Sequence, residues 1–258
     1  MLRPIALEDG ISALVDVSLR QRGVLVAFTE RGGGVSSGPF SALNLGMRSG
    51  DDRALVAENR RRACAALGIP AFVAAHQFHG SVVRSVGPAD AGARFDLGDD
   101  VVSGADALVA GASGVPIAVT VADCVPLALV DMAARRVAAV HAGWRGVAAG
   151  ILRSALAAFE DPARIEALIG PAVGPDHYEV GPEVVEAVSA EAGRACVVED
   201  GPRKPRLDLP ATVERMLRQL GVAHLQRSNL CTACEPGRFY SYRGEGRTGR
   251  QALIAALL

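Results

Sequence analysis

One cysteine and one histidine at the ends of two apolar runs are the side chains best placed for metal or nucleophilic chemistry. Cys124 directly follows Asp123 at the end of IAVTVAD, and His141 closes the run RVAAVH. Trp144 and Arg145 lie just beyond, after a turn of small residues. A thiol and an imidazole at neighbouring strand ends could ligate a soft metal ion, or could act as nucleophile and base.

The elements that must position these two side chains follow from the pattern around them. VPIAVTVAD and VPLALVD are typical of strands, MAAR of a turn, and RVAAVH of the returning strand of a hairpin. AGWRGVAAGILRSALAAFE then predicts turns at Gly143 and Gly146, followed by an Ala-rich amphipathic helix. Arg145 and the free N–H groups of that helix would share a side with His141 and would attract an anion.

A further pair of histidines lies upstream, in AFVAAHQFHGSVVRSV between two strand-like runs. If this segment is extended, the spacing of three places His76 and His79 on opposite faces. We therefore expect only one of them to serve any one site.

The remaining pattern predicts a mixture of helices and strands. Residues 23–30 and 165–170 are expected as strands, and ADALVA resumes a sheet after an acidic loop over 91–104. A helix is expected from the acidic pair 51–52 to Gly68, and two more begin at Pro182 and at the Asp208–Pro210 segment. The Gly- and Ser-rich loop that follows residue 30 offers Arg31 and Asn44 as hydrogen-bond donors to a ligand.

Composition excludes several classes of protein. The chain has 258 residues and a formal net charge of −1, so it has no global field to hold a nucleic acid or an anionic membrane. The acidic N-terminal segment opposes a signal peptide, and the most apolar window, 114–132, is interrupted by Asp123 and two prolines. Five cysteines are an odd number, which opposes a disulfide framework. We expect one cytoplasmic domain over 1–258.

The C-terminal segment combines a Cys-x-x-Cys pair with aromatic and basic residues. Cys231 and Cys234 alone are a weak zinc signal, because no second pair accompanies them. Tyr240, Tyr242 and Arg243 could stack on and hydrogen-bond a flat polar ligand. His177 and His224 lack a partner nearby in sequence, and we interpret both as structural.

Several motifs together resemble the YfiH-like family, whose members have been labelled polyphenol oxidase or laccase-domain protein, peptidoglycan editing factor and purine nucleoside phosphorylase. The motifs are HQFHG at 76–80, TVADCVPLALVD at 120–131, AAVHAGWRG at 138–146, IGPAVGPDHYEVG at 169–181 and CTACEPGRFYSYRGEGRTGRQ at 231–251. The resemblance implies an α+β fold, specifically a four-layer α/β/β/α sandwich with mixed sheets. It also implies a metal site formed by His79, Cys124 and His141.

Two imidazoles and a thiolate suit Zn²⁺, and three protein ligands leave one position open for catalysis. The resemblance implies purine nucleosides as substrates, through phosphorolysis and through deamination of adenosine. Asp123 is our candidate for a proton shuttle or for a residue that orients a ligand. Arg31, Arg145 and Arg243 are the candidate phosphate donors, and Asn44 and Tyr240 are further candidates for substrate contact. The oligomeric state is not predicted.

Three alternatives stay open. Cys124 and His141 could hydrolyse a peptidoglycan-type amide bond without a metal ion. The site could bind Cu²⁺ in a polyphenol oxidase, although a multicopper cluster needs on the order of ten histidines and the chain has five. Alternatively, a structural zinc ion in a binding protein could take Cys231 or Cys234 as its fourth ligand.

Overall fold

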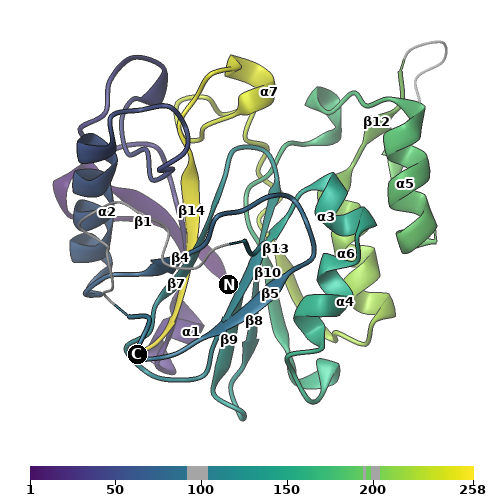
Figure 1. The fold of residues 1–258 in the computed structure, drawn as a ribbon, viewed down its shortest axis with the longest axis horizontal. Helices are drawn as coiled ribbons and strands as arrows, with labels where there is room; N and C mark the ends of the chain where they lie inside the picture. Colours follow the sequence, from purple (N-terminus) through teal and green to yellow (C-terminus); the bar gives the residue numbers. More distant parts are fainter. Residues whose placement is uncertain (92–103, 194–195, 199–203) are drawn as a thin grey trace.

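Two six-stranded sheets form the centre of the molecule in a computed structural model that describes residues 1–91, 104–193, 196–198 and 204–258 (Figure 1). The first sheet has the order β1-β2-β3-β14-β7-β4 and the second β13-β10-β8-β9-β6-β5. Both are mixed, because β4 pairs parallel with β7, and β13 and β5 pair parallel with β10 and β6. The acidic loop expected over 91–104 lies outside the described residues from 92 to 103.

The first sheet is assembled from both ends of the chain. Its strands are β1 (Leu2–Ala6), β2 (Ser12–Asp16), β3 (Val24–Thr29), β4 (Val73–Ala74), β7 (Ile117–Val121) and β14 (Gln251–Leu257). β14 lies between β3 and β7 and is antiparallel to both. The expected strand at 23–30 is confirmed. The N-terminal pair and the pairing of β14 were not predicted, because neither follows from local periodicity.

The second sheet contains the predicted hairpin. Its strands are β5 (Val83–Val86), β6 (Ala107–Ala110), β8 (Val125–Asp131), β9 (Arg136–Ala142), β10 (Glu166–Ile169) and β13 (His224–Arg227). β8 and β9 pair antiparallel across the turn at 132–135, as expected. A small separate ladder joins β11 (Val197–Val198) to β12 (Arg206–Leu207).

Helices cover the outer faces of both sheets. α2 (Arg53–Leu67) begins at Asp52, whose carboxylate accepts the Ala54 N–H, and ends at Gly68 with a φ of 72°, as the sequence predicts. α5 (Pro182–Ala192) and α6 (Leu209–Gln219) also form where expected. The expected helix after Gly146 is instead two short helices, α3 (Trp144–Ala148) and α4 (Ile151–Leu156), because Gly150 adopts a φ of 84° between them. Two more short helices are α1 (Val17–Gln21) and α7 (Tyr242–Glu245).

Alternation of side chains along the strands produces three cores. Leu127, Leu129 and Val140 pack under α4 and α6, whereas the intervening Ala128, Val130 and Ala139 face the first sheet. On the first sheet, Leu25 and Ile254 pack beneath α2. The chain is a single-domain α+β fold with mixed sheets.

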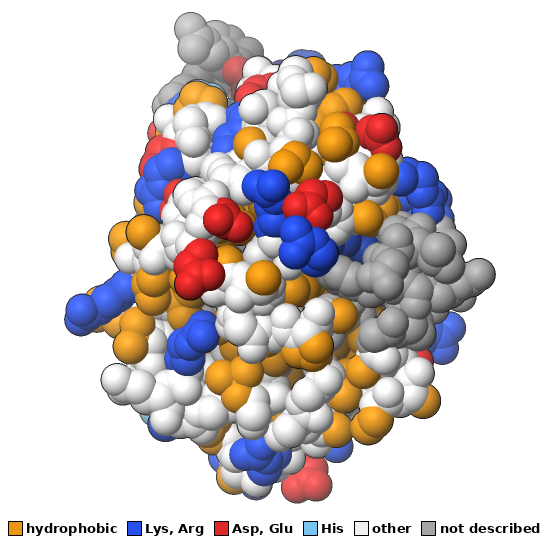
Figure 2. Space-filling view, turned by 90° about the vertical axis from the view of Figure 1, so that its left-hand side faces the viewer, with side chains coloured by type: hydrophobic (Ala, Val, Ile, Leu, Met, Phe, Trp, Pro, Cys, Tyr) orange, Lys and Arg blue, Asp and Glu red, His pale blue; other side chains and the backbone are white. Residues whose placement is uncertain are grey.

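The described surface carries mixed charge. On the face over α2, acidic and basic side chains lie interspersed (Figure 2), as where Glu58 pairs with both Arg61 and Arg62. That face offers no basic field of the kind that holds a polyanion. Within the described residues, no helix is both long enough and apolar enough to cross a bilayer.

Candidate functional site

The register of three neighbouring strands brings His141 and Cys124 together. In the β8–β9 hairpin Val125 pairs with Ala142, so Cys124 comes level with Gly143, two residues beyond His141. The β6–β9 pairing of Ala107 with Val140 places Asp106 opposite His141. These side chains lie on the face of the second sheet that turns toward the first, at the end of the core between the sheets.

Cys124 sits where the chain passes from one sheet to the other. β7 belongs to the first sheet and β8 to the second, and residues 122–124 make the connection as a bend. Asp123 adopts a φ of 89°, so the alternation of an extended strand does not apply to it. Both Asp123 and Cys124 therefore line the same cavity.

His79 reaches this pair from the loop that follows β4. The segment 76–81 is not extended, and His79 itself has a φ of 63°. His76 and His79 consequently both line the cavity, which corrects the expectation that they lie on opposite faces. The rings of His79 and His141 meet edge to face, with their centroids 4.7 Å apart.

The ligand atoms of His79, Cys124 and His141 all lie within 4.8 Å of one another. A glycine makes this approach sterically feasible, because a Cβ on Gly143 would lie 2.9 Å from Cys124 Sγ and 3.0 Å from His79 Cδ2. Two imidazoles and one thiolate form a donor set that suits Zn²⁺ or another borderline-soft divalent ion. The residues present therefore fit the metal ion that the sequence resemblance implies.

The sequence analysis missed the carboxylate that holds two of these ligands. Asp106 is fully buried, and its Oδ1 lies 2.8 Å from Nδ1 of His141. The same carboxylate accepts the backbone N–H groups of Phe78, His79 and Gly80 at 3.3, 2.9 and 2.7 Å. A carboxylate on one ring nitrogen fixes a ligating histidine and leaves the other nitrogen for the ion. A polar residue at the start of the apolar strand ADALVA was the available signal.

The buried charges in this group stabilise one another. Burial alone would raise the pKa of Cys124, but the charge and hydrogen bond of His141 and the hydrogen bond of His79 outweigh it and lower the pKa. The pKa of His141 is raised, because the Cys124 thiolate and Asp106 outweigh its burial. Burial likewise opposes ionisation of Asp106, yet the hydrogen bonds from His141 and Gly80 hold its pKa below the usual value. The thiol is therefore readily ionised.

Both carboxylate oxygens of Asp123 accept hydrogen bonds. Its Oδ1 accepts the hydroxyls of Thr232 and Ser241 at 2.6 and 2.8 Å, and its Oδ2 accepts the Arg243 N–H at 2.6 Å. The residue is 7% exposed. Because donors already occupy both oxygens, this arrangement favours a positioning role for Asp123 over a proton shuttle.

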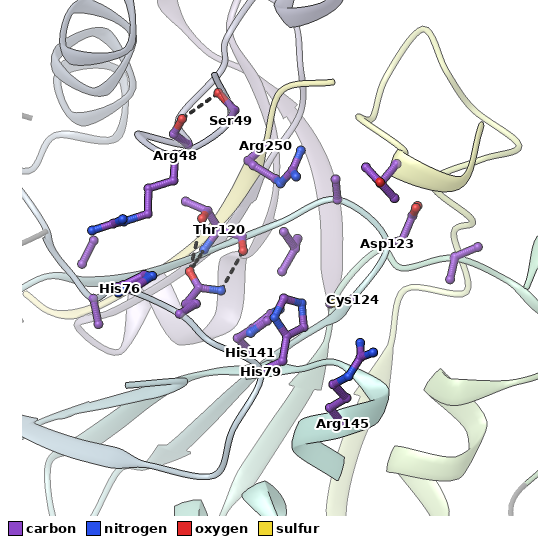
Figure 3. A pocket seen from close by; sticks show the side chains of 18 of the residues that line it. Arg48, Ser49, His76, His79, Thr120, Asp123, Cys124, His141, Arg145 and Arg250 are labelled. Carbon is purple, nitrogen blue, oxygen red and sulfur yellow. Dashed lines mark hydrogen bonds between the residues drawn. The ribbon is translucent and has the colours of Figure 1, made fainter. Parts of the chain in front are cut away.

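The cavity that contains these groups has a volume of about 540 Å³, within the range of small-molecule sites (Figure 3). Of the predicted donors, Arg145 and Arg243 line it. Arg145 is exposed, lies over the Trp144 ring at 4.3 Å, and is paired with no carboxylate among the described residues. Polar lining residues that the sequence analysis missed are Arg48, Ser49, Gln77, Thr120, Tyr178 and Arg250.

Three predicted substrate residues lie outside the lining of this cavity. Arg31 donates to the carbonyls of Ser41 and Pro236 and pairs with Glu245 at 2.7 Å. Asn44 is fully buried and bonds to its own loop and to the Arg250 N–H. Tyr240 is fully buried, and its hydroxyl donates to the Phe40 carbonyl. Asn44 supports the wall of the cavity through its hydrogen bonds to Gly46 and Arg250, whereas Arg31 and Tyr240 bond to residues outside the lining.

The two C-terminal cysteines are placed elsewhere. Cys231 and Cys234 form a separate group with His177, and their sulfur atoms are not part of the group around Cys124. The alternative in which one of them is the fourth ligand beside Cys124 is therefore wrong for this arrangement.

The chain is similar to known proteins over most of its length. Residues 25–258 match the family model described as multi-copper polyphenol oxidoreductase laccase. The purine nucleoside phosphorylase YfiH of Escherichia coli is 38% identical over 242 residues, covering 92% of this chain and 95% of that protein. A purine nucleoside phosphorylase of Streptomyces coelicolor is 42% identical over 236 residues, covering 89% and 94%.

Solved structures of similar proteins share the fold. YlmD from Geobacillus stearothermophilus superposes with a TM-score of 0.85 at 35% identity, covering 91% of this chain and 92% of the other. The Bacillus licheniformis hypothetical protein YfiH superposes with a TM-score of 0.89 at 29% identity, covering 95% and 96%.

Proposed function

The chain belongs to the YfiH-like family described as multi-copper polyphenol oxidoreductase laccase, and on this premise we propose that it is a metal-dependent purine nucleoside phosphorylase that also deaminates adenosine. The observation that carries the proposal is the His79, Cys124 and His141 group at one end of a cavity large enough for a nucleoside. The names of the relatives supply the substrate class.

In phosphorolysis, a phosphate oxygen forms a bond to C1′ of the ribose while the bond from C1′ to the purine nitrogen breaks. The products are the free base and ribose 1-phosphate. Deamination replaces the 6-amino group of adenosine with an oxygen from water and releases ammonia as inosine forms. A divalent ion supplies Lewis acidity when bound, which lowers the pKa of a water ligand to around 7.

The side chains of the site have separable roles in this proposal. His79, Cys124 and His141 would hold the ion, with Asp106 fixing the orientation of His141. Arg145 and Arg243 enter the cavity from α3 and α7 and would bind phosphate by charge-assisted hydrogen bonds. Tyr178, whose ring lies under the Arg243 guanidinium at 4.7 Å, would contact the flat base.

We also propose the four-layer α/β/β/α arrangement for the whole chain. Three separate cores support it: one beneath α2, one between the sheets and one beneath α4 and α6. The histidine count opposes the multicopper oxidase that the family description names, because the chain has five histidines and His177 belongs to a different group. Cu²⁺ can still bind the His₂Cys group, since it outcompetes Zn²⁺ at nitrogen and sulfur donors.

Metal analysis of the purified protein, combined with product analysis, tests the proposal. Wild type and Cys124→Ala are incubated with adenosine or inosine, with and without phosphate. We expect one ion in the His₂Cys site, free base only when phosphate is present, inosine from adenosine, and loss of these products in Cys124→Ala. If wild type forms neither base nor inosine, the proposal is wrong. Activity that survives a chelator but is lost on thiol alkylation would support the metal-independent hydrolase.

A further inference from the structure

A second cluster of metal-ligating side chains lies outside the nucleoside cavity. The ligand atoms of His177, Cys231 and Cys234 all lie within 4.8 Å of one another. His177 ends a short 3-10 turn over Pro175–His177, and the two cysteines lie 54 and 57 residues downstream of it in the turn 231–234. His177 and Cys234 are exposed and Cys231 is half-buried, so an ion can reach the cluster from solvent.

The donor atoms fit one class of ion. A tetrahedral Zn²⁺ with metal–sulfur bonds of about 2.3 Å holds its ligand atoms roughly 3.5 to 3.8 Å apart, so rotation of exposed side chains can close the set. The spacing of two residues between Cys231 and Cys234 is the spacing found in structural zinc sites. Thiolates select Zn²⁺ and similar soft ions over Mg²⁺ or Ca²⁺, which prefer oxygen.

The backbone around the cluster donates a hydrogen bond to one of its sulfur atoms. The Gly174 N–H donates to Cys231 Sγ at 3.2 Å, and a hydrogen bond of this kind orients and stabilises a ligating sulfur. A Cβ on Gly174 would lie 3.3 Å from that sulfur, so the glycine permits the close approach. Ala172 and Cys231 are bridged in parallel, and the Thr232 N–H donates to the Ala172 carbonyl at 3.0 Å. These contacts fix the two segments in register.

From this arrangement we propose a second, structural metal site in which His177, Cys231 and Cys234 hold a Zn²⁺-class ion. A cleft of about 180 Å³ lined by Gly174, Asp176, Cys231 and Cys234 gives access to it. Asp176, which also lines this cleft, pairs its exposed carboxylate with Arg206 at 3.0 Å, so the donors of the site are the imidazole and the two thiols. The ion would join the segment 174–177 to the turn 231–234, which are far apart in sequence and are held side by side by backbone hydrogen bonds.

This second site would support the first from behind. Thr232, between the two cysteines, is fully buried and donates to Asp123, the neighbour of Cys124. On the other segment, the Val173 N–H donates to the Asp123 carbonyl at 3.0 Å, and Tyr178 lines the nucleoside cavity. An ion that fixes these two segments therefore fixes the bend that carries Cys124.

Cobalt binding to the Cys124→Ala variant tests the proposal, because that variant has no thiolate in the first site. The reduced protein is titrated with Co²⁺ without oxygen, and the near-ultraviolet band of sulfur-to-cobalt charge transfer is measured. We expect one equivalent of Co²⁺ with the intensity of two thiolates. Adding Cys231→Ser and Cys234→Ser should abolish the band, and adding His177→Ala should weaken Co²⁺ binding at least tenfold. His224→Ala and Cys196→Ser, at residues outside the cluster, are the matched controls.

A second measurement covers the case in which Cys124→Ala does not fold. In the wild-type background, Zn²⁺ stoichiometry should fall from two ions to one when Cys231 and Cys234 are both replaced by serine. The proposal is wrong if wild type holds a single ion, if the double variant keeps two, or if the charge-transfer band persists without both cysteines. Formation of a Cys231–Cys234 disulfide in place of ion binding would also refute it. None of these readouts depends on nucleoside turnover.

Discussion

The carboxylate of Asp106 lies 2.8 Å from Nδ1 of His141 and also accepts the backbone N–H of His79. One buried side chain therefore orients an imidazole on β9 and the loop that carries the other imidazole of the candidate metal site. The two histidines are 62 residues apart in sequence, from 79 to 141, and Asp106 is their common support.

Asp106→Asn should weaken metal binding while leaving the fold intact. The amide keeps the size of the side chain but removes the negative charge of the carboxylate that faces His141 Nδ1. It also turns an NH₂ group toward backbone N–H groups of the loop at 78–80. We expect the dissociation constant for Zn²⁺ to rise roughly ten- to hundredfold, measured by competition with a chromophoric chelator. Asp131→Asn is the matched control, because Asp131 is also fully buried and paired with Arg164 far from the site. Equal affinity in wild type and Asp106→Asn would contradict the role given to Asp106.

Gly143→Ala should disturb the metal site by steric contact alone. Gly143 has a φ of −76°, so alanine strains no backbone angle, yet its Cβ would meet Cys124 Sγ at 2.9 Å and His79 Cδ2 at 3.0 Å. We expect Zn²⁺ stoichiometry and nucleoside turnover to fall together, with circular dichroism unchanged. Gly87→Ala is the control, because no atom lies within 4 Å of the Cβ that it would add. Full metal occupancy in Gly143→Ala would show that the ligands can move apart without loss.

Cys124 should be the thiol of the metal-free protein that is alkylated at the lowest pH. The neighbouring histidines lower its pKa to about 6, so the thiolate persists at neutral pH and is lost only as the pH falls through that value. Burial raises the pKa of Cys64 to about 12, which makes it the internal control. Iodoacetamide labelling between pH 5 and 9, followed by peptide mass spectrometry, should show Cys124 modified below pH 7.5 and protected by Zn²⁺. A labelling midpoint near the ordinary thiol value of about 8.5 would refute the thiolate.

Arg145→Gln should affect phosphate binding, whereas Arg31→Gln should affect thermal stability. Loss of the exposed Arg145 guanidinium removes a charge-assisted phosphate contact worth about 1.5–3 kcal/mol, so KM for phosphate should rise roughly ten- to hundredfold at unchanged Tm. Arg31 bonds to two carbonyls and to Glu245, so its replacement should lower the Tm by several degrees and leave that KM within about twofold. Steady-state kinetics with varied phosphate and thermal unfolding separate the two outcomes. A normal KM for phosphate in Arg145→Gln would show that Arg145 does not bind the anion, and Arg243 and Arg250 would become the candidates.

Local pattern in the sequence was sufficient for elements that are determined by their own residues. Helix α2 formed where Asp52 and Gly68 cap it, and the β8–β9 hairpin formed because its two apolar runs flank a short turn. The strand β14 at 251–257 was missed as a partner of β3 and β7, because nothing local indicates pairings such as Leu253 with Phe28 or Gln251 with Val121, which are far apart in sequence.

The candidate site was predictable as a set of residue types but not as a geometry. His79 has a positive φ value, so reasoning from the two-residue period of a strand misplaced it relative to His76. Arg31, Asn44 and Tyr240 were chosen because their side chains can bind ligands, yet burial and intramolecular hydrogen bonds occupy all three. Asp106 looked like one more residue of a short strand, and only the pairing of β6 with β9 shows that it faces His141.

The central position of β14 in the first sheet has a consequence for how the protein is made. β14 follows every other strand in the chain, and it separates β3 from β7 in the finished sheet. The native order of the first sheet therefore cannot be complete until residues 251–257 are available to pair with both strands. The cavity also needs Arg250, which directly precedes β14. The part of the cavity wall that Arg250 provides is therefore placed only when β14 takes its position between β3 and β7.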